Sequence, residues 1–151
     1  MRPEADVSKA RLLRPAVAAI ITNAEGKILL QRRSDNGLWG LPGGSVEIGE
    51  SVGQAILREV REETGLTVEV VRLIGVYSDP KFQVVRYPDD NVVHYVSILF
   101  GCRISGGTLQ TCDETLDLGF FAPTELPDDL VPMHRIRIED AVAERPTAFI
   151  R

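Results

Sequence analysis

Residues 43–66 predict more of this structure than any other part of the chain, and they read Gly-Gly-Ser-Val-Glu-Ile-Gly-Glu-Ser-Val-Gly-Gln-Ala-Ile-Leu-Arg-Glu-Val-Arg-Glu-Glu-Thr-Gly-Leu. A glycine loop comes first, and a segment with helical periodicity follows it. Ser51 is a residue type that favours the N-terminal cap of a helix, and Gly65 stands where a glycine commonly ends one. The pattern therefore predicts a loop followed by a helix between Ser51 and Gly65.

The predicted helix has one apolar side. On a helical wheel with about 100° per residue, four aliphatic residues share this side and should face a core. They are Val52, Ala55, Ile56 and Val60. The polar residues of the opposite side are Gln54, Arg58 and Arg61.

Three glutamates do not follow this division. Glu59 and Glu63 fall in the middle of the apolar side, one turn apart, and Glu62 lies at its margin. Carboxylates without partners are costly to desolvate, and carboxylates this close repel one another. A bound divalent cation would offset both effects, because hard cations such as Mg²⁺ take oxygen ligands. The alternative is a solvated acidic helix end whose carboxylates pair with Arg58 and Arg61.

The same stretch resembles the Nudix box, the signature of the Nudix hydrolases. Five residues separate Gly44 from Glu50, and seven more separate Glu50 from the Arg-Glu pair that begins at Arg58. An aliphatic residue, an arginine, two glutamates, a threonine, a glycine and the aliphatic Leu66 complete the box. The segment from Trp39 to the paired glycines is similar to the family's usual lead-in. The resemblance is to MutT-like and ADP-ribose pyrophosphatase-like members.

The rest of the chain contains mainly predicted strands. Runs of aliphatic and β-branched residues predict strands where glycine, proline, asparagine or aspartate bound them. The predicted strands are 15–22, 27–32, 67–78, 82–87, 92–104 and 116–121. Gly75 is expected to mark a bulge, and residues 105–107 (Ser-Gly-Gly) are expected to turn the chain.

A second helix is predicted over residues 133–143. Its expected apolar residues are Ile136, Ala141 and Val142, with Ile138 part-way round. The order of strands, helix, strands and helix predicts an α+β domain with a mixed sheet.

The resemblance implies the Nudix fold, an α/β/α sandwich with the box helix on one side of the sheet and the C-terminal helix on the other. The length of 151 residues suits one domain with a substantial core. We expect residues 1–13 to form an N-terminal lead-in and residues 14–151 to form the single Nudix domain.

The resemblance also implies which residues act on a substrate. Glu59, Glu62 and Glu63, together with the backbone oxygen of Gly43, are expected to hold one or more Mg²⁺ ions, with Mn²⁺ as a substitute. The family cleaves a nucleoside diphosphate linked to a moiety X by attack of water on phosphorus. A metal at such a site neutralises charge on the leaving phosphate and acidifies a water molecule.

Other box residues have an expected structural role. In the family, the pair that matches Glu50 and Arg58 forms a salt bridge that fixes the loop on the helix. We therefore expect Gly44, Glu50, Arg58 and Gly65 to shape the site, with direct metal ligation by Glu50 as the alternative.

The general base is left open between the box and a loop outside it. Glu114 lies just before the last predicted strand, where many family members carry a glutamate near the metals. We expect Glu114 to be a metal ligand or the base, with Asp113 as the neighbouring alternative. The alternative without a functional role is that Glu114 simply belongs to an acidic turn.

Three residues outside the box are candidates for substrate binding. Arg32 and Arg33 end a predicted strand and would bind phosphate, or else remain a solvated strand end. Trp39 would stack on a base, or else pack beneath the glycine loop.

The substrate class follows only from the resemblance. Pro80 lies near the position where ADP-ribose-cleaving members tend to carry a proline, so ADP-ribose or a related nucleotide is the expected substrate. The alternatives are hydrolysis of (d)NTPs in nucleotide sanitation and a catalytically silent domain that senses a nucleotide. A prenyl diphosphate isomerase on the same fold is disfavoured, because the chain shows no cysteine–glutamate pairing for that chemistry.

Bulk properties limit the partners and the location. The hydrophobic fraction is 44%, the charged fraction is 26%, and no apolar run approaches the ~20 residues of a membrane span. We expect a cytoplasmic protein with a small-molecule nucleotide substrate. The net charge of −5 disfavours nucleic acid as a partner. Cys102 and Cys112 lack metal-site spacing. A homodimer is left open.

Overall fold

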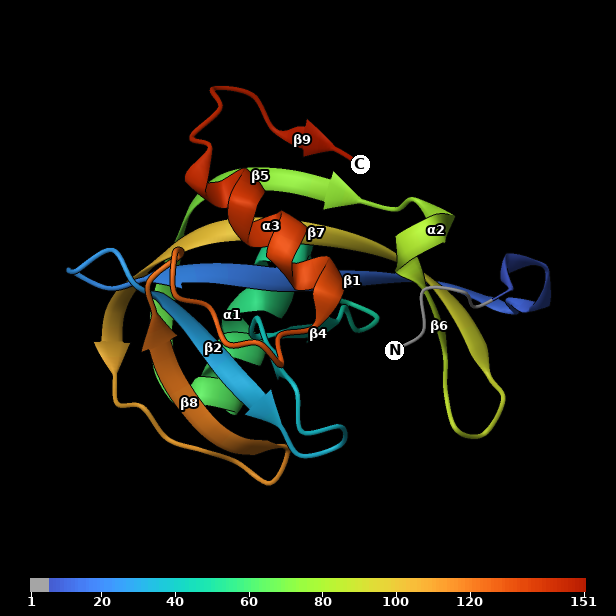
Figure 1. Cartoon of the computed structure of the whole chain (residues 1–151), viewed down its shortest axis with the longest axis horizontal. Coiled ribbons are helices and arrows are strands. Elements are labelled where there is room, and N and C mark those ends of the chain that lie inside the picture. The colour runs from blue at the N-terminus through green and yellow to red at the C-terminus, as the bar shows by residue number, and fades with distance from the viewer. Residues whose placement is uncertain (1–5) are drawn as a thin grey trace.

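The structure is a computed structural model that describes residues 6–151 (Figure 1). Its helices are the 3₁₀ helix η1 (Val7–Lys9) and the α-helices α1 (Val52–Thr64), α2 (Pro80–Gln83) and α3 (Pro132–Val142). Its strands are β1 (Leu12–Thr22), β2 (Ile28–Arg33), β3 (Trp39–Gly40), β4 (Gly43–Ser45), β5 (Leu66–Tyr77), β6 (Val84–Arg86), β7 (Val92–Gly107), β8 (Thr115–Phe121) and β9 (Phe149–Ile150). Residues 1–5 of the expected lead-in lie outside the described residues.

The strands form one mixed sheet, as predicted. Its main order is β3-β2-β1-β7-β5-β9, while β4 pairs with β1, β6 with β7 and β8 with β2. The centre is the parallel pair of β1 and β7, which runs in register from Leu12 opposite Val93 to Thr22 opposite Arg103. β5 lies antiparallel to β7. The long parallel centre requires the helical crossover that α1 supplies between β1 and β7.

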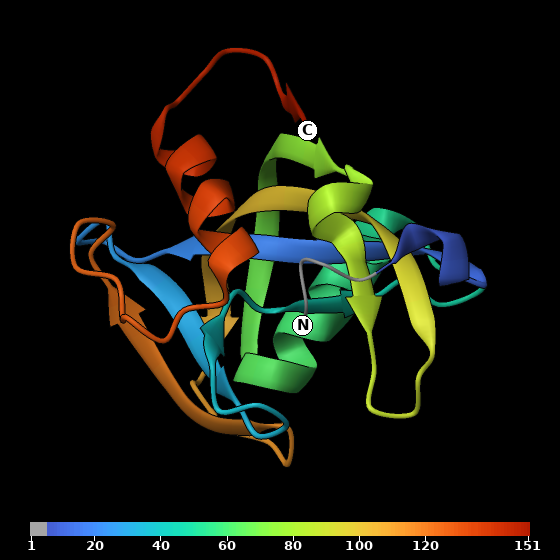
Figure 2. The same cartoon turned by 45° about the vertical axis from the view of Figure 1, so that its right-hand side comes forward.

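A helix covers each face of the sheet, which confirms the predicted α/β/α arrangement. Alternate residues of β1 point to opposite faces. Val17, Ala19 and Ile21 join the core cluster beneath α1, whereas Ala18 and Ile20 join the cluster beneath α3. The two views of the ribbon show α1 behind the sheet and α3 in front of it (Figures 1 and 2).

The box helix begins and ends where the sequence predicts. The Ser51 hydroxyl accepts a hydrogen bond from the Gln54 N–H at 3.1 Å, and the Gln54 side chain accepts one from the Ser51 N–H at 2.9 Å. This reciprocal pair is a capping box. At the other end Gly65 has a φ of 78°, a left-handed conformation that favours glycine.

The predicted strand 82–87 is partly wrong. Residues 80–83 form α2, and only Val84–Arg86 are strand β6. The Asp79 side chain accepts a hydrogen bond from the Lys81 N–H, and Pro80 occupies the first helical turn. Aspartate at an N-cap followed by proline is a helix start signal, and here it takes precedence over the β-branched residues that follow.

The predicted turn at residues 105–107 is also wrong, because β7 continues to Gly107 and pairs with the start of β5. Gly107 has a φ of 81°, and a Cβ at this position would lie 2.4 Å from the Gly65 carbonyl oxygen. The glycine thus allows a close backbone approach where helix α1 passes into β5. The predicted bulge at Gly75 is confirmed by a register shift between Leu73 and Gly75.

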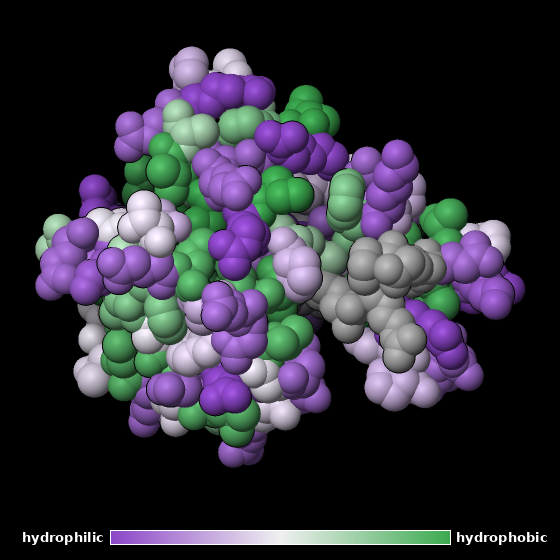
Figure 3. Space-filling view, in the orientation of Figure 1, coloured by the Kyte–Doolittle hydropathy of each residue, from purple (hydrophilic) through white to green (hydrophobic). Residues whose placement is uncertain are grey.

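The predicted C-terminal helix is present, and the prediction of its apolar side was only partly correct. Ile136 and Val142 are exposed, whereas Ile138 and Ala141 are buried. The surface over α3 shows hydrophilic and hydrophobic residues side by side (Figure 3).

Two charged residues of α3 are buried instead, and their partners lie on other elements. Arg137 donates a hydrogen bond to Gln83 at 2.9 Å, and its guanidinium lies 5.3 Å from the centre of the Tyr77 ring. Asp140 accepts hydrogen bonds from the Tyr77 hydroxyl at 2.8 Å and from Arg151. A helical wheel cannot foresee these contacts, because Tyr77, Gln83 and Arg151 lie outside the helix. No helix among residues 6–151 is long and apolar enough to cross a membrane.

Candidate active site

The glycine loop lies between β1 and α1 and leaves no room for side chains at its two glycines. Gly43 pairs with Ala18 in the sheet, and a Cβ on Gly43 would lie 2.2 Å from the Val17 carbonyl oxygen. A Cβ on Gly44 would lie 2.5 Å from the carboxyl carbon of Glu59. Glycine at both positions therefore lets the loop backbone lie directly against the sheet and against the helix carboxylate.

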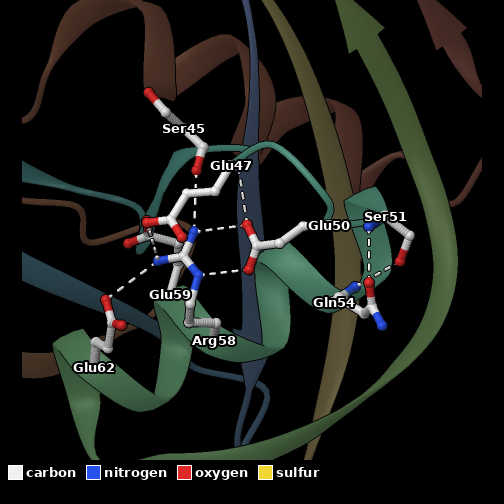
Figure 4. A network of polar contacts seen from close by, with 8 residues as sticks. All are labelled: Ser45, Glu47, Glu50, Ser51, Gln54, Arg58, Glu59 and Glu62. Atoms are coloured by element: carbon white, nitrogen blue, oxygen red, sulfur yellow. Dashed lines mark hydrogen bonds and ion pairs between the residues drawn. The ribbon is translucent and has the colours of Figure 1, made fainter.

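Arg58 ties this loop to the helix (Figure 4). Its Nε lies 2.6 Å from Glu50 Oε2, and its Nη2 lies 3.0 Å from Glu50 Oε1, so the pair is bidentate. The same Nη2 donates to the Ser45 carbonyl oxygen at 3.1 Å. The ion pair that the resemblance implies is thus present, and it joins the loop at Ser45 and Glu50 to the middle of α1.

The remaining nitrogen of Arg58 faces two of the candidate metal ligands. Its Nη1 donates to Glu59 Oε1 at 3.0 Å and to Glu62 Oε2 at 3.3 Å (Figure 4). The wheel placed Arg58 on the side away from the core, yet its side chain is only 23% exposed because the guanidinium reaches back over the loop. Arg58 therefore neutralises part of the negative charge that the box concentrates.

Glu63 is the most deeply buried of the box carboxylates, with 5% of the residue exposed. Its Oε1 accepts a hydrogen bond from the Gly43 N–H at 2.9 Å, and its Oε2 accepts one from the Gln31 side chain. Burial raises the pKa of Glu63 to about 7, while these two hydrogen bonds oppose the rise and the charge of Glu59 adds to it. The wheel's placement of Glu63 on the core side is therefore correct.

Gln31 was not among the site residues predicted from the sequence. This residue is 1% exposed, and its side-chain oxygen accepts a hydrogen bond from the Thr115 hydroxyl at 2.9 Å. It thus connects Glu63 to the start of β8. A glutamine directly after the apolar run Ile-Leu-Leu was the available signal, because a polar residue in a buried strand needs a specific partner.

Glu59 lies beside Glu63 and is half-buried. Burial raises the pKa of Glu59, Arg58 lowers it, and the charges of Glu62 and Glu114 raise it further. Glu62 is the most exposed of the three box glutamates, with 60% of its side chain exposed. The negative charges of the box and of Glu114 therefore act on one another.

Glu114 lies in the turn before β8, and its charge acts on Glu59. Its carbonyl oxygen accepts a hydrogen bond from the Ser34 N–H at 3.0 Å, which holds the turn against the end of β2. Its charge also contributes to the raised pKa of Arg33, after the larger effect of the Asp35 ion pair. Asp113 is exposed in the same turn. The fold thus brings Glu114 into the electrostatic surroundings of Glu59 and Arg33.

The three candidates for substrate contact occupy different surroundings. Arg32 is exposed and donates to the Gly37 carbonyl oxygen at 3.0 Å, and Arg33 pairs with Asp35 at 2.9 Å. The Trp39 ring contacts Phe121 edge to face, with 5.0 Å between the ring centres. Trp39 also packs against the core cluster beneath α3, so its contacts within the protein are those of a packing residue.

The donor chemistry of the site fits a hard divalent cation. Carboxylate oxygens and a backbone carbonyl are the ligands that such cations prefer, and a bound cation would favour the charged form of Glu63, which burial disfavours. Within residues 6–151, no three acidic, histidine or cysteine side chains converge closely enough to enclose a metal. The oxygens of Glu59 and Glu62 face Arg58 instead. The oxygen donors that could hold a cation here are the side chains of Glu59, Glu62 and Glu63 and the backbone carbonyl of Gly43.

The chain is similar to known proteins over most of its length. The family model of the NUDIX domain matches residues 12–141. An ADP-ribose pyrophosphatase of Methanocaldococcus jannaschii is 43% identical over 127 residues, covering 81% of this chain and 71% of the relative. A putative 8-oxo-dGTP diphosphatase of Bacillus subtilis is 40% identical over 121 residues, covering 80% of this chain and 74% of the relative.

Solved structures agree as well. The crystal structure of a UDP-X diphosphatase superposes with a TM-score of 0.75 at 32% identity, covering 91% of this chain and 66% of that one. The Nudix family depends in general on divalent metal ions, and its pyrophosphohydrolases cleave acid anhydride bonds. The family match across most of the chain and the two relatives at about 40% identity lead to one conclusion: this chain belongs to the Nudix family and is a pyrophosphohydrolase.

Proposed function

We propose that the enzyme hydrolyses the diphosphate bond of a nucleoside diphosphate linked to a second moiety, with ADP-ribose or a related nucleotide as its substrate. The observation that carries the reaction is the pairing of the glycine loop with two desolvated carboxylates, Glu59 and Glu63. The ADP-ribose assignment is supported by the 43% identical relative that bears that name. Pro80, which the resemblance connects with ADP-ribose, begins α2.

The cofactor in this proposal is Mg²⁺, with Mn²⁺ as a substitute. Its ligands would be Glu59, Glu62, Glu63 and the Gly43 carbonyl. When bound, the cation would neutralise charge on the diphosphate and acidify a water molecule. Glu50 and Arg58 hold the loop in place in this scheme, and Gly44 leaves space for the Glu59 carboxylate.

We assign Glu114 as a further metal ligand or as the general base. Its charge acts on Glu59, and its exposed side chain lies on a turn that is bonded to Ser34, directly after β2. A box glutamate remains the other candidate for the base. Arg33 is the more suitable of the two arginines for phosphate binding, because its charge is felt by both Glu63 and Glu114.

A second candidate function is hydrolysis of (d)NTPs, which the 40% identical Bacillus subtilis relative favours by its name. Both reactions use the same carboxylates and differ in the nucleotide that is held. The complete set of box carboxylates weighs against a silent nucleotide sensor. A cytoplasmic location and a homodimer remain predictions.

A substrate panel tests the proposal. The full chain is incubated with Mg²⁺ or Mn²⁺ and with ADP-ribose, nucleotide sugars, dinucleoside polyphosphates and (d)NTPs, and the products are identified by chromatography. Cleavage of ADP-ribose to AMP and ribose phosphate is the expected result. Release of pyrophosphate and a monophosphate from a triphosphate would establish the second function instead. Tight nucleotide binding without any cleavage would contradict both.

A further inference from the structure

The backbone of Leu41–Gly43, which leads into the glycine loop, is anchored at three successive points. The Gly43 N–H donates to Glu63, and the Pro42 carbonyl oxygen accepts from the Ala19 N–H at 2.9 Å. The third anchor comes from the opposite face of the sheet: the Leu41 N–H donates to Nδ1 of His134, on α3, at 3.0 Å. Helix α3 thus reaches the loop through one imidazole ring.

This ring takes the place of a main-chain acceptor. The segment before α3 runs parallel to β3, with the Trp39 N–H donating to the Asp129 carbonyl oxygen and the Val131 N–H to the Trp39 carbonyl oxygen. The next bond of a parallel ladder would run from the Leu41 N–H to the Val131 carbonyl oxygen. That oxygen accepts the His134 N–H instead, because the chain turns into helix α3. Nδ1 of His134 accepts the Leu41 N–H, which has no main-chain acceptor in the ladder.

The surroundings keep this ring in the form that accepts a hydrogen bond. Burial lowers the pKa of His134 well below its ordinary value, and the charges of Arg137 and Arg33 lower it further. Because Nδ1 accepts the Leu41 N–H, the ring is in its neutral form with the proton on Nε2. Gly40 provides the space, since a Cβ there would lie 2.9 Å from Nδ1.

We propose that His134 is a positioning residue of the metal site, holding Leu41 so that the Gly43 carbonyl is presented to the divalent cation. The inference rests on the proposed function, because that function assigns the Gly43 carbonyl as a ligand. His134 itself contacts neither metal nor substrate in this scheme. It acts through the backbone of Leu41–Gly43.

The test compares two variants of nearly equal size. His134→Asn keeps an oxygen that can accept from Leu41, whereas His134→Leu has no acceptor. Binding of Mn²⁺ alone to the full chain is measured by the electron paramagnetic resonance signal of free Mn²⁺. We expect His134→Leu to weaken Mn²⁺ binding about 10-fold, as is typical for an outer-shell partner, and His134→Asn to restore most of it. In turnover assays, kcat should fall in the Leu variant while the substrate KM changes little.

Two further variants keep the test decisive. Gly40→Ala displaces the ring without altering it and should weaken Mn²⁺ binding in the same way, even if His134→Leu fails to fold. His94→Leu removes the other histidine, whose ring bonds to the Ser78 carbonyl oxygen, and should leave Mn²⁺ binding unchanged. Circular dichroism checks that each variant is folded.

The outcomes separate this inference from the function on which it rests. Wild-type Mn²⁺ affinity in folded His134→Leu would overturn the role of His134 alone, as would equal weakening in the Asn and Leu variants. Failure of the wild-type chain to bind Mn²⁺ would overturn the metal site itself.

Discussion

The two helices that cover the sheet are held in place by different means. α1 is defined by its own sequence, with a capping box at Ser51, a left-handed glycine at Gly65 and an arginine that ties it to the preceding loop. α3 begins at Pro132, its N-cap residue Val131 provides no side-chain cap, and its buried charged residues bond to distant elements. The helix that carries the chemistry is thus specified locally, whereas the opposite helix is specified by tertiary contacts.

The largest expected effect is a loss of turnover caused by Glu59→Gln in α1. Turnover is expected to fall by more than about 100-fold, beyond the loss typical of an outer-shell partner, because the substitution removes a proposed ligand charge. Stability should be little changed, since burial already disfavours the charged form of Glu59. Steady-state kinetics and urea unfolding measure the two quantities. Glu69→Gln, which alters an exposed ion pair with Arg103, is the matched control and should keep wild-type turnover.

Substitutions in α3 should change the stability of the protein rather than its turnover. Ile138 is 1% exposed, and Ile138→Ala is expected to lower the free energy of unfolding by about 2–5 kcal/mol. Val142→Ala, at an exposed position of the same helix, should change it by less than about 0.5 kcal/mol. Urea unfolding of both variants provides the comparison. Equal effects at the two positions would mean that α3 is not held by packing.

The stability of the fold should depend on pH in opposite directions through buried groups on the two faces of the sheet, His134 on one and Glu63 on the other. His134 has a lowered pKa in the folded state, so the unfolded chain binds more protons as the pH falls below the ordinary value of 6.5. This contribution to stability is present above pH 6.5 and is lost as the pH falls. The slope for one such group is at most about 1.4 kcal/mol per pH unit.

Glu63 acts in the opposite direction. Its pKa is raised to about 7 from 4.5, so the folded state binds the extra proton and stability from this group is lost as the pH rises through about 7. The difference between the wild type and His134→Asn isolates the histidine contribution. We expect the Asn variant to lose less stability than the wild type between pH 6.5 and about 5, measured by urea unfolding without metal. Parallel pH curves would contradict the neutral histidine.

The smallest effect should come from the helix cap. Ser51→Ala removes the acceptor of the Gln54 N–H and is expected to cost about 1 kcal/mol of stability. Ser34→Ala is the control, because only the backbone of Ser34 is bonded to Glu114. A cost for Ser51→Ala no larger than that of the control would show that α1 depends on packing as α3 does.

The sequence predicted those parts of the molecule in which neighbouring residues carry the signal. The caps of α1, the burial of Glu63 and the mixed sheet all follow from local pattern or from the family resemblance. The short helix α2 was missed because an Asp-Pro start signal was interpreted only as a strand break. The turn expected at residues 105–107 was wrong because β7 continues through them and Gly107 allows a close backbone approach rather than a reversal.

The buried face of α3 could not be read from the sequence for a different reason. Arg137 and Asp140 are buried because Tyr77, Gln83 and Arg151 supply hydrogen bonds or a ring face. Their partners come together only once the sheet has formed. Gln31 and His134 were missed in the same way, since each is an acceptor or donor for a residue that is distant in the chain.

The hydrogen bonds that end at His134 also limit the transfer of the Nudix box into another protein. The acceptor of the Leu41 N–H lies 93 residues further along the chain, and the donor to Glu63 Oε2 lies on β2. A graft of residues 43–66 into another sheet would leave both behind. Such a chimaera would carry the complete signature and still lack the scaffold that orients it, so successful transplantation would require moving three separated segments together.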